Sequence, residues 1–167
     1  MGFAFGLVYI VFSDPWTPFL WPGLGIALVG LLTRIWAAGH LRKHEALALS
    51  GPYRYTRNPL YLGSFIMGLG FTLAAGRFWI LALFLVLFLA VYLPVMRAEV
   101  RELETWYGEA FRSYARRVPL FVPSLRPARL QQDRSFSWAQ VRKNREYNAV
   151  IGFCLLCLIL LAKRFFV

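Results

Sequence analysis

Acidic side chains are scarce in this sequence: 8 Asp and Glu residues stand against 19 Lys and Arg, and 16% of the 167 residues are charged. Hydrophobic residues make up 59% of the chain and aromatic residues 17%, more than a soluble domain usually carries. This composition argues against a soluble enzyme and indicates an integral membrane protein. The net charge of +11 accompanies long apolar runs, which favours a basic membrane face over a nucleic-acid partner.

Cysteine is nearly absent as well. Cys154 and Cys157 are the two cysteines of the chain, and they lie within an apolar run with no histidine beside them. A metal-binding CxxC pair needs further ligands, so we interpret both as thiols of a membrane helix and predict no metal site. The N-terminus lacks the charged region and the small-residue cleavage site of a signal peptide. We therefore expect its first apolar stretch to be kept as a helix.

Five apolar segments alternate with polar connections, and they cover residues 2–12, 19–38, 60–75, 78–96 and 149–162. A membrane-spanning helix needs about 20 residues, so segment 2–12 is short unless it is tilted or continues upstream. Basic residues concentrate in the second and fourth connections, which the positive-inside rule places in the cytoplasm. We predict an all-α integral membrane protein of about five transmembrane helices in a bacterial-type inner membrane. Its N-terminus and both basic connections are cytoplasmic, and anionic lipid is their partner.

The stretch GPYRYTRNPLYLG, residues 51–63, places arginine, tyrosine and proline between two apolar segments. Pro59 suits the first turn of a helix, where its missing N–H costs nothing, and Asn58 is a good N-cap. The helix N-terminus favours an anionic ligand, and Tyr53, Tyr55 and Tyr61 offer flat faces with hydrogen-bonding tips. The stretch is therefore either part of a ligand site or an interfacial aromatic belt with snorkelling arginines.

A second polar stretch follows segment 78–96. Glu99 is at helical spacing from Met96, Leu103 and Trp106, so it lies on the apolar face of a helix that leaves the membrane, with Glu102 one turn away. A carboxylate on that face is costly and indicates a functional site. The alternative is a structural ion pair with one of three nearby arginines: Arg57, Arg97 and Arg101.

We expect this helix to end at Tyr107 and Gly108, after which RRVPLFVP returns the chain to the interface. Both polar stretches then share the cytoplasmic face, where they offer a carboxylate, aromatic rings and a helix N-terminus. Such a set suits a zwitterionic sulfonium cofactor. The carboxylate would hold its ammonium group, an arginine or the helix N-terminus its carboxylate, and the rings its adenine and its cation.

The two stretches resemble the isoprenylcysteine carboxyl methyltransferase and phospholipid methyltransferase superfamily of integral membrane enzymes that use S-adenosylmethionine. The resemblance rests on GPYRYTRNPLYLG, the hydrophobic hairpin after it and the pattern E-x3-L-x3-YG-x2-F-x2-Y-x2-RVP. It implies a single membrane methyltransferase domain over 1–167, with core motifs in 41–123. A basic linker, 124–148, and an additional C-terminal transmembrane helix, 149–163, complete the expected organisation.

The resemblance also implies site residues. For the cofactor they are Leu47, Tyr53, Asn58, Pro59, Leu60, Tyr61 and Glu99, of which Glu99 matches the glutamate that holds the cofactor's amino group. The expected catalytic residues are Arg57, Glu99 and Arg117, and those expected near the acceptor are Arg97, Glu102 and Tyr107. A carboxylate acceptor needs only a cationic guide, whereas an amine acceptor must lose a proton to a carboxylate or to Tyr61.

Three positions depart from the superfamily pattern. Asn58 replaces the usual histidine, which argues against histidine acid–base chemistry there. Val100 replaces the second glutamate of a pair, for which Glu102 is a possible substitute. Val95 stands where the prenylcysteine enzymes carry an arginine that meets the substrate carboxylate, which argues against that substrate. A prenylcysteine-like carboxylate, a lipid amine and a small lipophilic metabolite all stay open as acceptors.

Two other functions compete with a methyltransferase. Membrane sterol and steroid reductases have a cassette similar to NPLY and use NADPH. If the chain is such a reductase, NADPH rather than S-adenosylmethionine should protect it from thermal unfolding. A non-catalytic scaffold whose basic loops bind anionic lipid predicts no nucleotide-like ligand. The Glu99 helix and the YG-x2-F-x2-Y pattern favour the methyltransferase.

Overall fold

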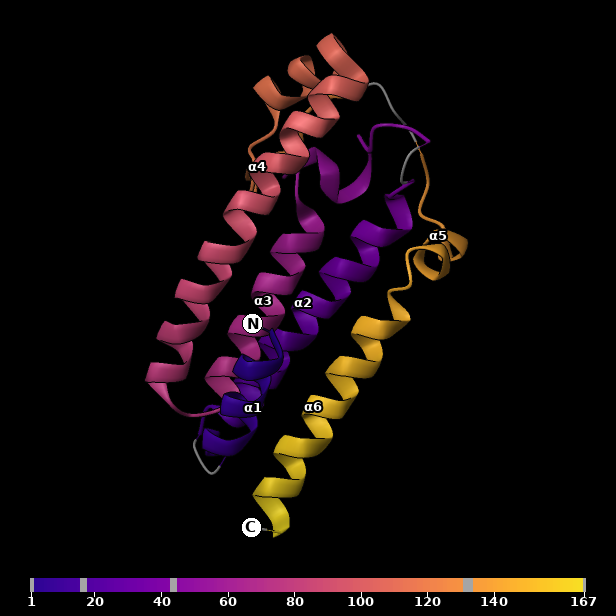
Figure 1. Cartoon of the computed structure of the whole chain (residues 1–167). Helices are drawn as coiled ribbons and strands as arrows, with labels where there is room; N and C mark the ends of the chain where they lie inside the picture. Colours follow the sequence, from indigo (N-terminus) through magenta and orange to yellow (C-terminus); the bar gives the residue numbers. More distant parts are fainter. Residues whose placement is uncertain (1, 16–17, 43–44, 131–133, 167) are drawn as a thin grey trace.

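The computed structural model describes residues 2–15, 18–42, 45–130 and 134–166. These residues form helices and connecting loops and contain no strand, so the all-α prediction is confirmed. In chain order the helices are α1 (Gly2–Phe12), α2 (Leu20–His40), the short 3₁₀ helix η1 (Gly51–Arg54), α3 (Pro59–Ala74), α4 (Phe78–Arg117), α5 (Trp138–Lys143) and α6 (Tyr147–Phe166) (Figure 1).

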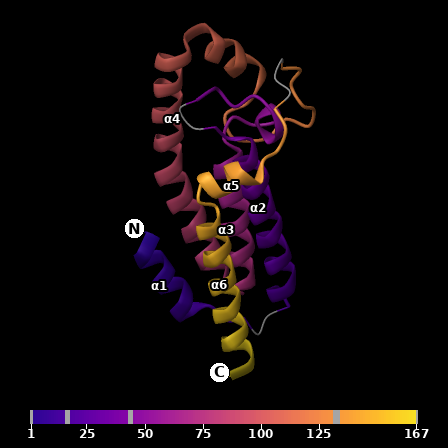
Figure 2. The ribbon, with the colours of Figure 1, turned by 90° about the vertical axis from the view of Figure 1, so that its right-hand side faces the viewer.

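Within the described residues, three helices are long and apolar enough to cross a membrane, namely α2, α4 and α6. The apolar helix α3 is shorter, with 16 residues, and α1 has 11. The helices α2, α3 and α4 stand side by side, and α6 runs along this group on another side from α4 (Figures 1 and 2). The loops between α2 and α3 and the upper end of α4 gather at one end of the bundle. We call this the loop end.

Glycines bring α2 and α3 into close contact. A Cβ atom on Gly30 would lie 2.3 Å from the backbone nitrogen of Met67, and one on Gly70 would lie 2.2 Å from that of Ala27. Small residues at such contacts are the usual means by which membrane helices approach each other. The α2–α3 pair is therefore a rigid scaffold for the loop end.

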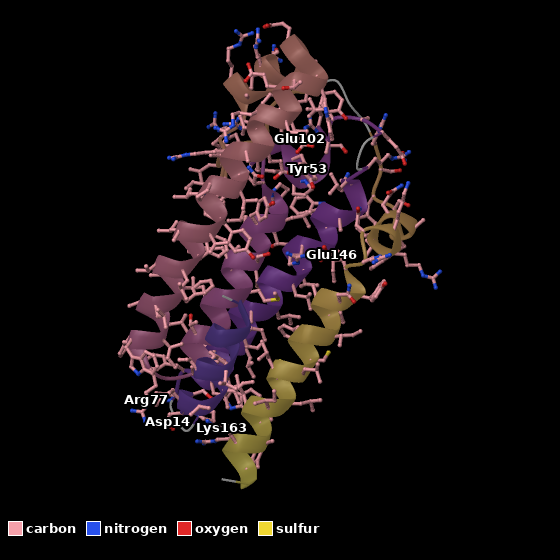
Figure 3. The ribbon with its side chains drawn as sticks, viewed as in Figure 1. Asp14, Tyr53, Arg77, Glu102, Glu146 and Lys163 are labelled. Atoms are coloured by element: carbon pink, nitrogen blue, oxygen red, sulfur yellow. The ribbon has the colours of Figure 1, made fainter. Side chains whose placement is uncertain are left out.

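Polar contacts at the opposite end of the bundle join α6 and α4 to the end of α1. Lys163 Nζ donates hydrogen bonds to the backbone oxygens of Ile10 (2.9 Å) and Ser13 (2.7 Å). Arg77 Nη2 lies 3.0 Å from Asp14 Oδ2. Figure 3 shows Asp14, Arg77 and Lys163 together there, far from Tyr53, Glu102 and Glu146. A cation beside the last carbonyls of α1 is a favourable cap for that helix.

The predicted end of the fourth helix is confirmed as a break in α4. The helix is interrupted at Gly108, whose φ is 51° and ψ is −125°, and a second helical stretch that was not predicted follows to Arg117. Glycine adopts such angles without steric cost, so the chain changes direction there and helical turns resume. Figure 2 shows the upper part of α4 turning back over the loops. The segment 109–117 is thereby brought onto the loop end.

Candidate functional site

A cavity of about 620 Å³ lies at the loop end. Its walls come from the end of α2, the loops on either side of η1, the start of α3, one face of α4 and the junction between α5 and α6. All of the predicted site residues except Arg97 and Arg117 line it: Leu47, Tyr53, Arg57, Asn58, Pro59, Leu60, Tyr61, Glu99, Glu102 and Tyr107. Residues far apart in the sequence thus meet around one space large enough for a cofactor.

The face of α4 that carries Glu99 forms one wall. Met96, Leu103 and Trp106 line the cavity together with Glu99, as the helical spacing predicted. The hydroxyl of Tyr61 on α3 lies beside the Glu99 carboxylate. This neighbourhood brings α3 and α4 together at the cavity.

The opposite wall begins with residues 53–58, which the chain after α4 holds in place through backbone hydrogen bonds. The Arg57 amide donates to the Pro119 carbonyl over 2.9 Å, and the Ser124 amide donates to the Tyr55 carbonyl over 2.9 Å. The hydroxyl of Tyr114 adds a bond to the Tyr53 carbonyl over 2.9 Å. The two polar stretches of the sequence therefore form one hydrogen-bonded unit.

Asn58 occupies the N-cap position of α3, but its side chain does not make the expected capping bond. Its Nδ2 instead donates to the Leu120 carbonyl over 2.9 Å. The buried Thr56 hydroxyl accepts a hydrogen bond from the Asn58 amide over 3.3 Å and donates to the Phe121 carbonyl over 2.9 Å. Asn58 thus links α3 to the chain after α4. The sequence predicted its N-cap position correctly, but the expected side-chain capping hydrogen bond is not formed.

Arg57 and Tyr53 have unusual environments on this wall. Burial lowers the pKa of the Arg57 guanidinium below its ordinary value, and its buried Nε has no hydrogen-bond partner among the described residues. Tyr53 is 6% exposed, and burial holds the pKa of its phenol well above the ordinary value of 10. A buried N–H without an acceptor is costly, so the Arg57 side chain, which is partly buried as a whole, is suited to an anionic ligand in the cavity.

Two predicted residues lie elsewhere. Arg97 is exposed on α4 and does not line the cavity. Arg117 lines a separate hollow with Arg54 and Arg129 on the other side of Tyr114. The structure therefore does not bring either arginine together with Glu99.

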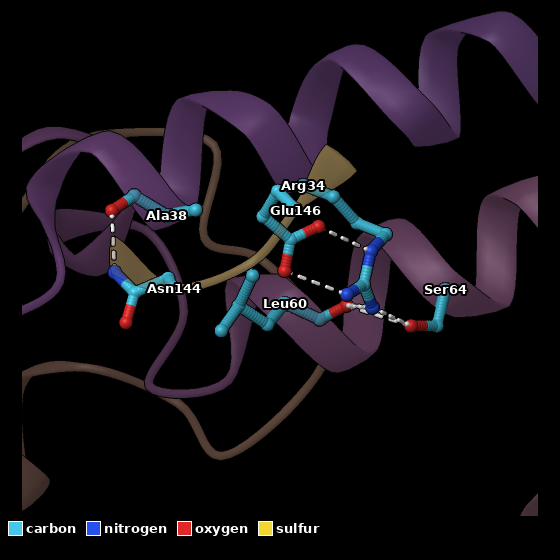
Figure 4. Close-up of polar contacts among 6 residues, drawn as sticks. All are labelled: Arg34, Ala38, Leu60, Ser64, Asn144 and Glu146. Atoms are coloured by element: carbon cyan, nitrogen blue, oxygen red, sulfur yellow. Dashed lines mark hydrogen bonds and ion pairs between the residues drawn. The ribbon is translucent and has the colours of Figure 1, made fainter. Parts of the chain in front are cut away.

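An ion pair that the sequence reasoning missed lies at the cavity, between α2 and the start of α6 (Figure 4). Arg34 Nε lies 3.0 Å from Glu146 Oε2, and Arg34 Nη2 lies 2.8 Å from Glu146 Oε1. The remaining Arg34 nitrogen donates to the Ser64 hydroxyl and to the Leu60 carbonyl. The Glu146 side chain is 6% exposed and that of Arg34 is 21% exposed, so this two-bond pair is largely withdrawn from solvent.

The junction around Glu146, residues 144–149, lines the cavity opposite α4, and we call it the α5–α6 corner. Asn144 Nδ2 donates to the carbonyls of Ala38 and Leu41, each over 2.9 Å, and so binds the corner to the end of α2. Arg145 has a φ of 56°, a value rare for residues other than glycine. The corner is thus part of the site although it falls in the predicted basic linker.

A signal for this pair was present in the sequence. Arg34 is the single charged residue in the apolar segment 19–38, and a charge within a membrane helix indicates a functional site. Glu146 is less visible, because it lies among basic residues that suggest only a cytoplasmic loop. Its partner could be found only from the fold.

Part of the chain that forms this cavity is similar to known proteins. Residues 31–110 match the model of the phospholipid methyltransferase family. The chain is 36% identical over 105 residues to a cobalt-zinc-cadmium resistance protein of Cupriavidus metallidurans, a match over 62% of this chain and 47% of the relative. It is 34% identical over 105 residues to a nickel-cobalt-cadmium resistance protein of Alcaligenes xylosoxydans xylosoxydans, with the same shares of 62% and 47%.

An enzyme of established reaction is also similar. The chain is 29% identical over 86 residues to the protein-S-isoprenylcysteine O-methyltransferase of Schizosaccharomyces pombe, a match over 52% of this chain and 36% of that enzyme. The chain thus covers less than half the length of each of these three relatives. No solved structure matches it significantly. In the described part of the chain, no group of three or more His, Cys, Asp or Glu residues is placed to hold a metal ion.

The family match begins within α2, includes the Glu99 wall of the cavity and ends just after the break at Gly108. The resemblance predicted from the two polar stretches is therefore confirmed, and residues 31–110 are similar to the phospholipid methyltransferase family.

Proposed function

We propose that this protein is a membrane methyltransferase that uses S-adenosylmethionine to methylate a lipophilic acceptor. The observation that carries the proposal is the pairing of Glu99 on one wall with Arg57 on the other, around a cavity within the family-matched segment. A zwitterionic amino acid moiety needs this combination of opposite charges. The similarity to an isoprenylcysteine methyltransferase supports the same reaction class.

The residues around the cavity fit the cofactor. Glu99, with Glu102 one turn away, would hold its ammonium group, and the unpartnered Nε of Arg57 would donate to its carboxylate. Tyr53 and Tyr61 offer aromatic faces for the adenine ring and the sulfonium. The remaining cofactor contacts in this proposal are Leu47, Asn58, Pro59 and Leu60. A volume of about 620 Å³ lies within the range of cofactor pockets.

When bound, S-adenosylmethionine supplies an electrophilic methyl group, whose bond to sulfur breaks as the acceptor's lone pair forms the new bond. The task of the chain is to align the acceptor with this methyl group and to exclude water. Met96 and Phe111 are buried at the cavity and keep it apolar. Glu102 and Tyr107 line the cavity from α4, and an amine acceptor would lose its proton to Glu99 or Glu102.

The proposal includes the membrane setting. The chain is a single domain with about five transmembrane helices, counting the short α1 and α3, in a bacterial-type inner membrane. The loop end and the N-terminus face the cytoplasm, where the basic loops contact anionic lipid. The additional helix over 149–163 and the basic linker before it belong to the same domain.

Binding of radiolabelled S-adenosylmethionine to purified protein in detergent tests the proposal. Glu99→Ala removes a charge-assisted hydrogen bond to the cofactor and is expected to weaken binding about 10-fold to 100-fold. Glu104→Ala is the matched control, because Glu104 is on the same helix but forms a salt bridge with Arg112 outside the cavity. Equal binding by the wild type and Glu99→Ala would refute the assignment.

A thermal-shift comparison separates the competing functions. S-adenosylmethionine should raise the melting temperature of the wild type, and NADPH should leave it unchanged, because binding to the folded state alone stabilises it. Protection by NADPH instead would favour the reductase, and protection by neither would favour the scaffold.

A further inference from the structure

We propose that the α5–α6 corner is the acceptor-binding side of the cavity and that Arg145 binds an anionic group of the acceptor, a carboxylate or a phosphate. The inference rests on the proposed methyltransferase function. It concerns a part of the chain, residues 144–149, that lies outside the family-matched segment 31–110.

The backbone of the corner favours glycine where Arg145 stands. The Arg145 amide donates to the Arg142 carbonyl over 2.9 Å, and the Glu146 amide donates to the Val141 carbonyl over 3.2 Å. This pair of bonds is the Schellman motif that ends α5, in which the residue at the position of Arg145 is usually glycine. Its φ of 56° places the Arg145 backbone in the left-handed region, at a cost for any residue with a Cβ atom. A long cationic side chain at this position therefore points to a use of the side chain itself.

The Arg145 side chain is available to a ligand. It lines the cavity, and its guanidinium forms no hydrogen bond or ion pair with any other described residue. Its neighbour Lys143, by contrast, forms a salt bridge with Glu45 over 2.6 Å outside the cavity. Arg145 is an exposed residue of the cavity lining, and its guanidinium offers several donors in a fork that matches a carboxylate or a phosphate.

Apart from the Arg34–Glu146 ion pair, whose charges offset each other, the charges around the cavity divide between its two sides. Glu99 and Glu102 are on α4, whereas Arg42, Arg57 and Arg145 come from the loop between α2 and α3 and from the corner. The cations of the cofactor, its ammonium and sulfonium, suit the acidic side, and Arg57 is committed to its carboxylate. The charge of Arg42 already acts on Glu45. Arg145 is therefore the lining arginine that is left for the remaining space. An acceptor with an anionic group fits that space best.

The ion pair beneath Arg145 holds it in place rather than binding the acceptor. Every nitrogen of Arg34 already has a partner, and both oxygens of Glu146 are bonded to Arg34. Together with Asn144, this pair fixes the corner against α2. Arg34 and Glu146 are positioning residues, and Arg145 is the binding residue.

Arg145→Gly separates binding from folding, because glycine relieves the backbone while it removes the guanidinium. The probe is a total bacterial lipid extract, divided by anion exchange into an acidic and a non-acidic fraction and offered with tritiated S-adenosylmethionine. We expect the wild type to label the acidic fraction. Arg145→Gly should lower that labelling about 10-fold or more at low acceptor concentration, with melting temperature and cofactor affinity at least at wild-type values.

Two further variants sharpen the result. Arg145→Lys keeps the charge and should retain part of the labelling, and Arg142→Ala, an exposed arginine of α5 that does not line the cavity, should label as the wild type does. Wild-type labelling by Arg145→Gly overturns the inference. So does a wild type that binds the cofactor but labels only the non-acidic fraction or neither fraction. A wild type that does not bind the cofactor refutes the methyltransferase function instead.

Discussion

The two sides of the cavity are held in place by different means. Residues 53–58 are fixed to the chain after α4 by hydrogen bonds in which backbone groups take part, such as those from Arg57 to Pro119 and from Ser124 to Tyr55. The α5–α6 corner is fixed to α2 by side chains, through the Arg34–Glu146 pair and through Asn144. A backbone contact tolerates most substitutions, whereas a contact of charged side chains depends on two residues. The wall of residues 53–58 therefore tolerates more substitutions, whereas the position of the corner depends on a few specific side chains.

The largest effect should come from breaking the pair on the corner. Glu146→Gln leaves the Arg34 cation without its counter-charge in a mostly buried setting, and we expect the free energy of unfolding to fall by about 3 kcal/mol. Thermal unfolding in detergent measures this loss. The double variant Arg34→Met/Glu146→Leu should regain most of it, because a buried pair is often replaceable by apolar residues.

The exposed salt bridge of Glu104 with Arg112 provides the control for this measurement. Glu104→Gln should leave the melting temperature unchanged, since solvent screens such surface pairs. If Glu146→Gln and Glu104→Gln lowered the melting temperature equally, burial would not distinguish the Arg34–Glu146 pair from the Glu104–Arg112 pair. The special role of the buried pair at the corner would then be contradicted.

A smaller effect is expected from the other side. Thr56→Val removes a buried hydroxyl that donates to the Phe121 carbonyl and accepts from the Asn58 amide, and we expect a loss of about 1–3 kcal/mol in unfolding free energy. Because α3 then loses part of its tie to the chain after α4, the affinity for S-adenosylmethionine should fall as well. A variant that unfolds earlier but binds cofactor as the wild type does would contradict the role given to these bonds.

The smallest effect concerns pH. The hydrogen bond and charge of Lys143 lower the pKa of Glu45 below its ordinary value of 4.5. A lowered folded-state pKa stabilises the fold above the unfolded value, and this contribution is lost as pH falls through the folded value. The wild type and Glu45→Gln should thus differ slightly in melting temperature at pH 7, and the difference should vanish at pH well below 4.5. If the difference in melting temperature grew as the pH fell, the Lys143–Glu45 salt bridge would not be its cause.

The sequence predicted the site best where residues recur at helical spacing or belong to a recognisable motif. The spacing of Met96, Glu99 and Leu103 placed all three on one face of α4, and Pro59 marked the start of α3. The break at Gly108 was visible, but not the helical turns after it, because the packing of Phe111 and Tyr114 against the loops, which helps to stabilise them, depends on the fold.

The α5–α6 corner was not foreseen for a different reason. Arg34 and Glu146 are more than a hundred positions apart, and nothing local links them. Asn58 shows the same limit at shorter range. Its position before Pro59 predicted the N-cap, yet its side chain bonds to Leu120, which the fold alone brings near. Tertiary contacts of single polar side chains are therefore what the sequence could not provide.

The length of α4 has a consequence for the lipid around the protein. From Phe78 to its break at Gly108 the helix measures about 45 Å, against about 30 Å for the hydrocarbon core of a bilayer. Glu99 lies about 30 Å along that helix, close to where the hydrocarbon ends. A thicker or thinner bilayer that changes the tilt of α4 therefore moves this carboxylate relative to Arg57 on the other side of the cavity. In the proposed methyltransferase, acyl-chain length would thus be a physical control on the geometry of the cavity, exerted by the membrane itself.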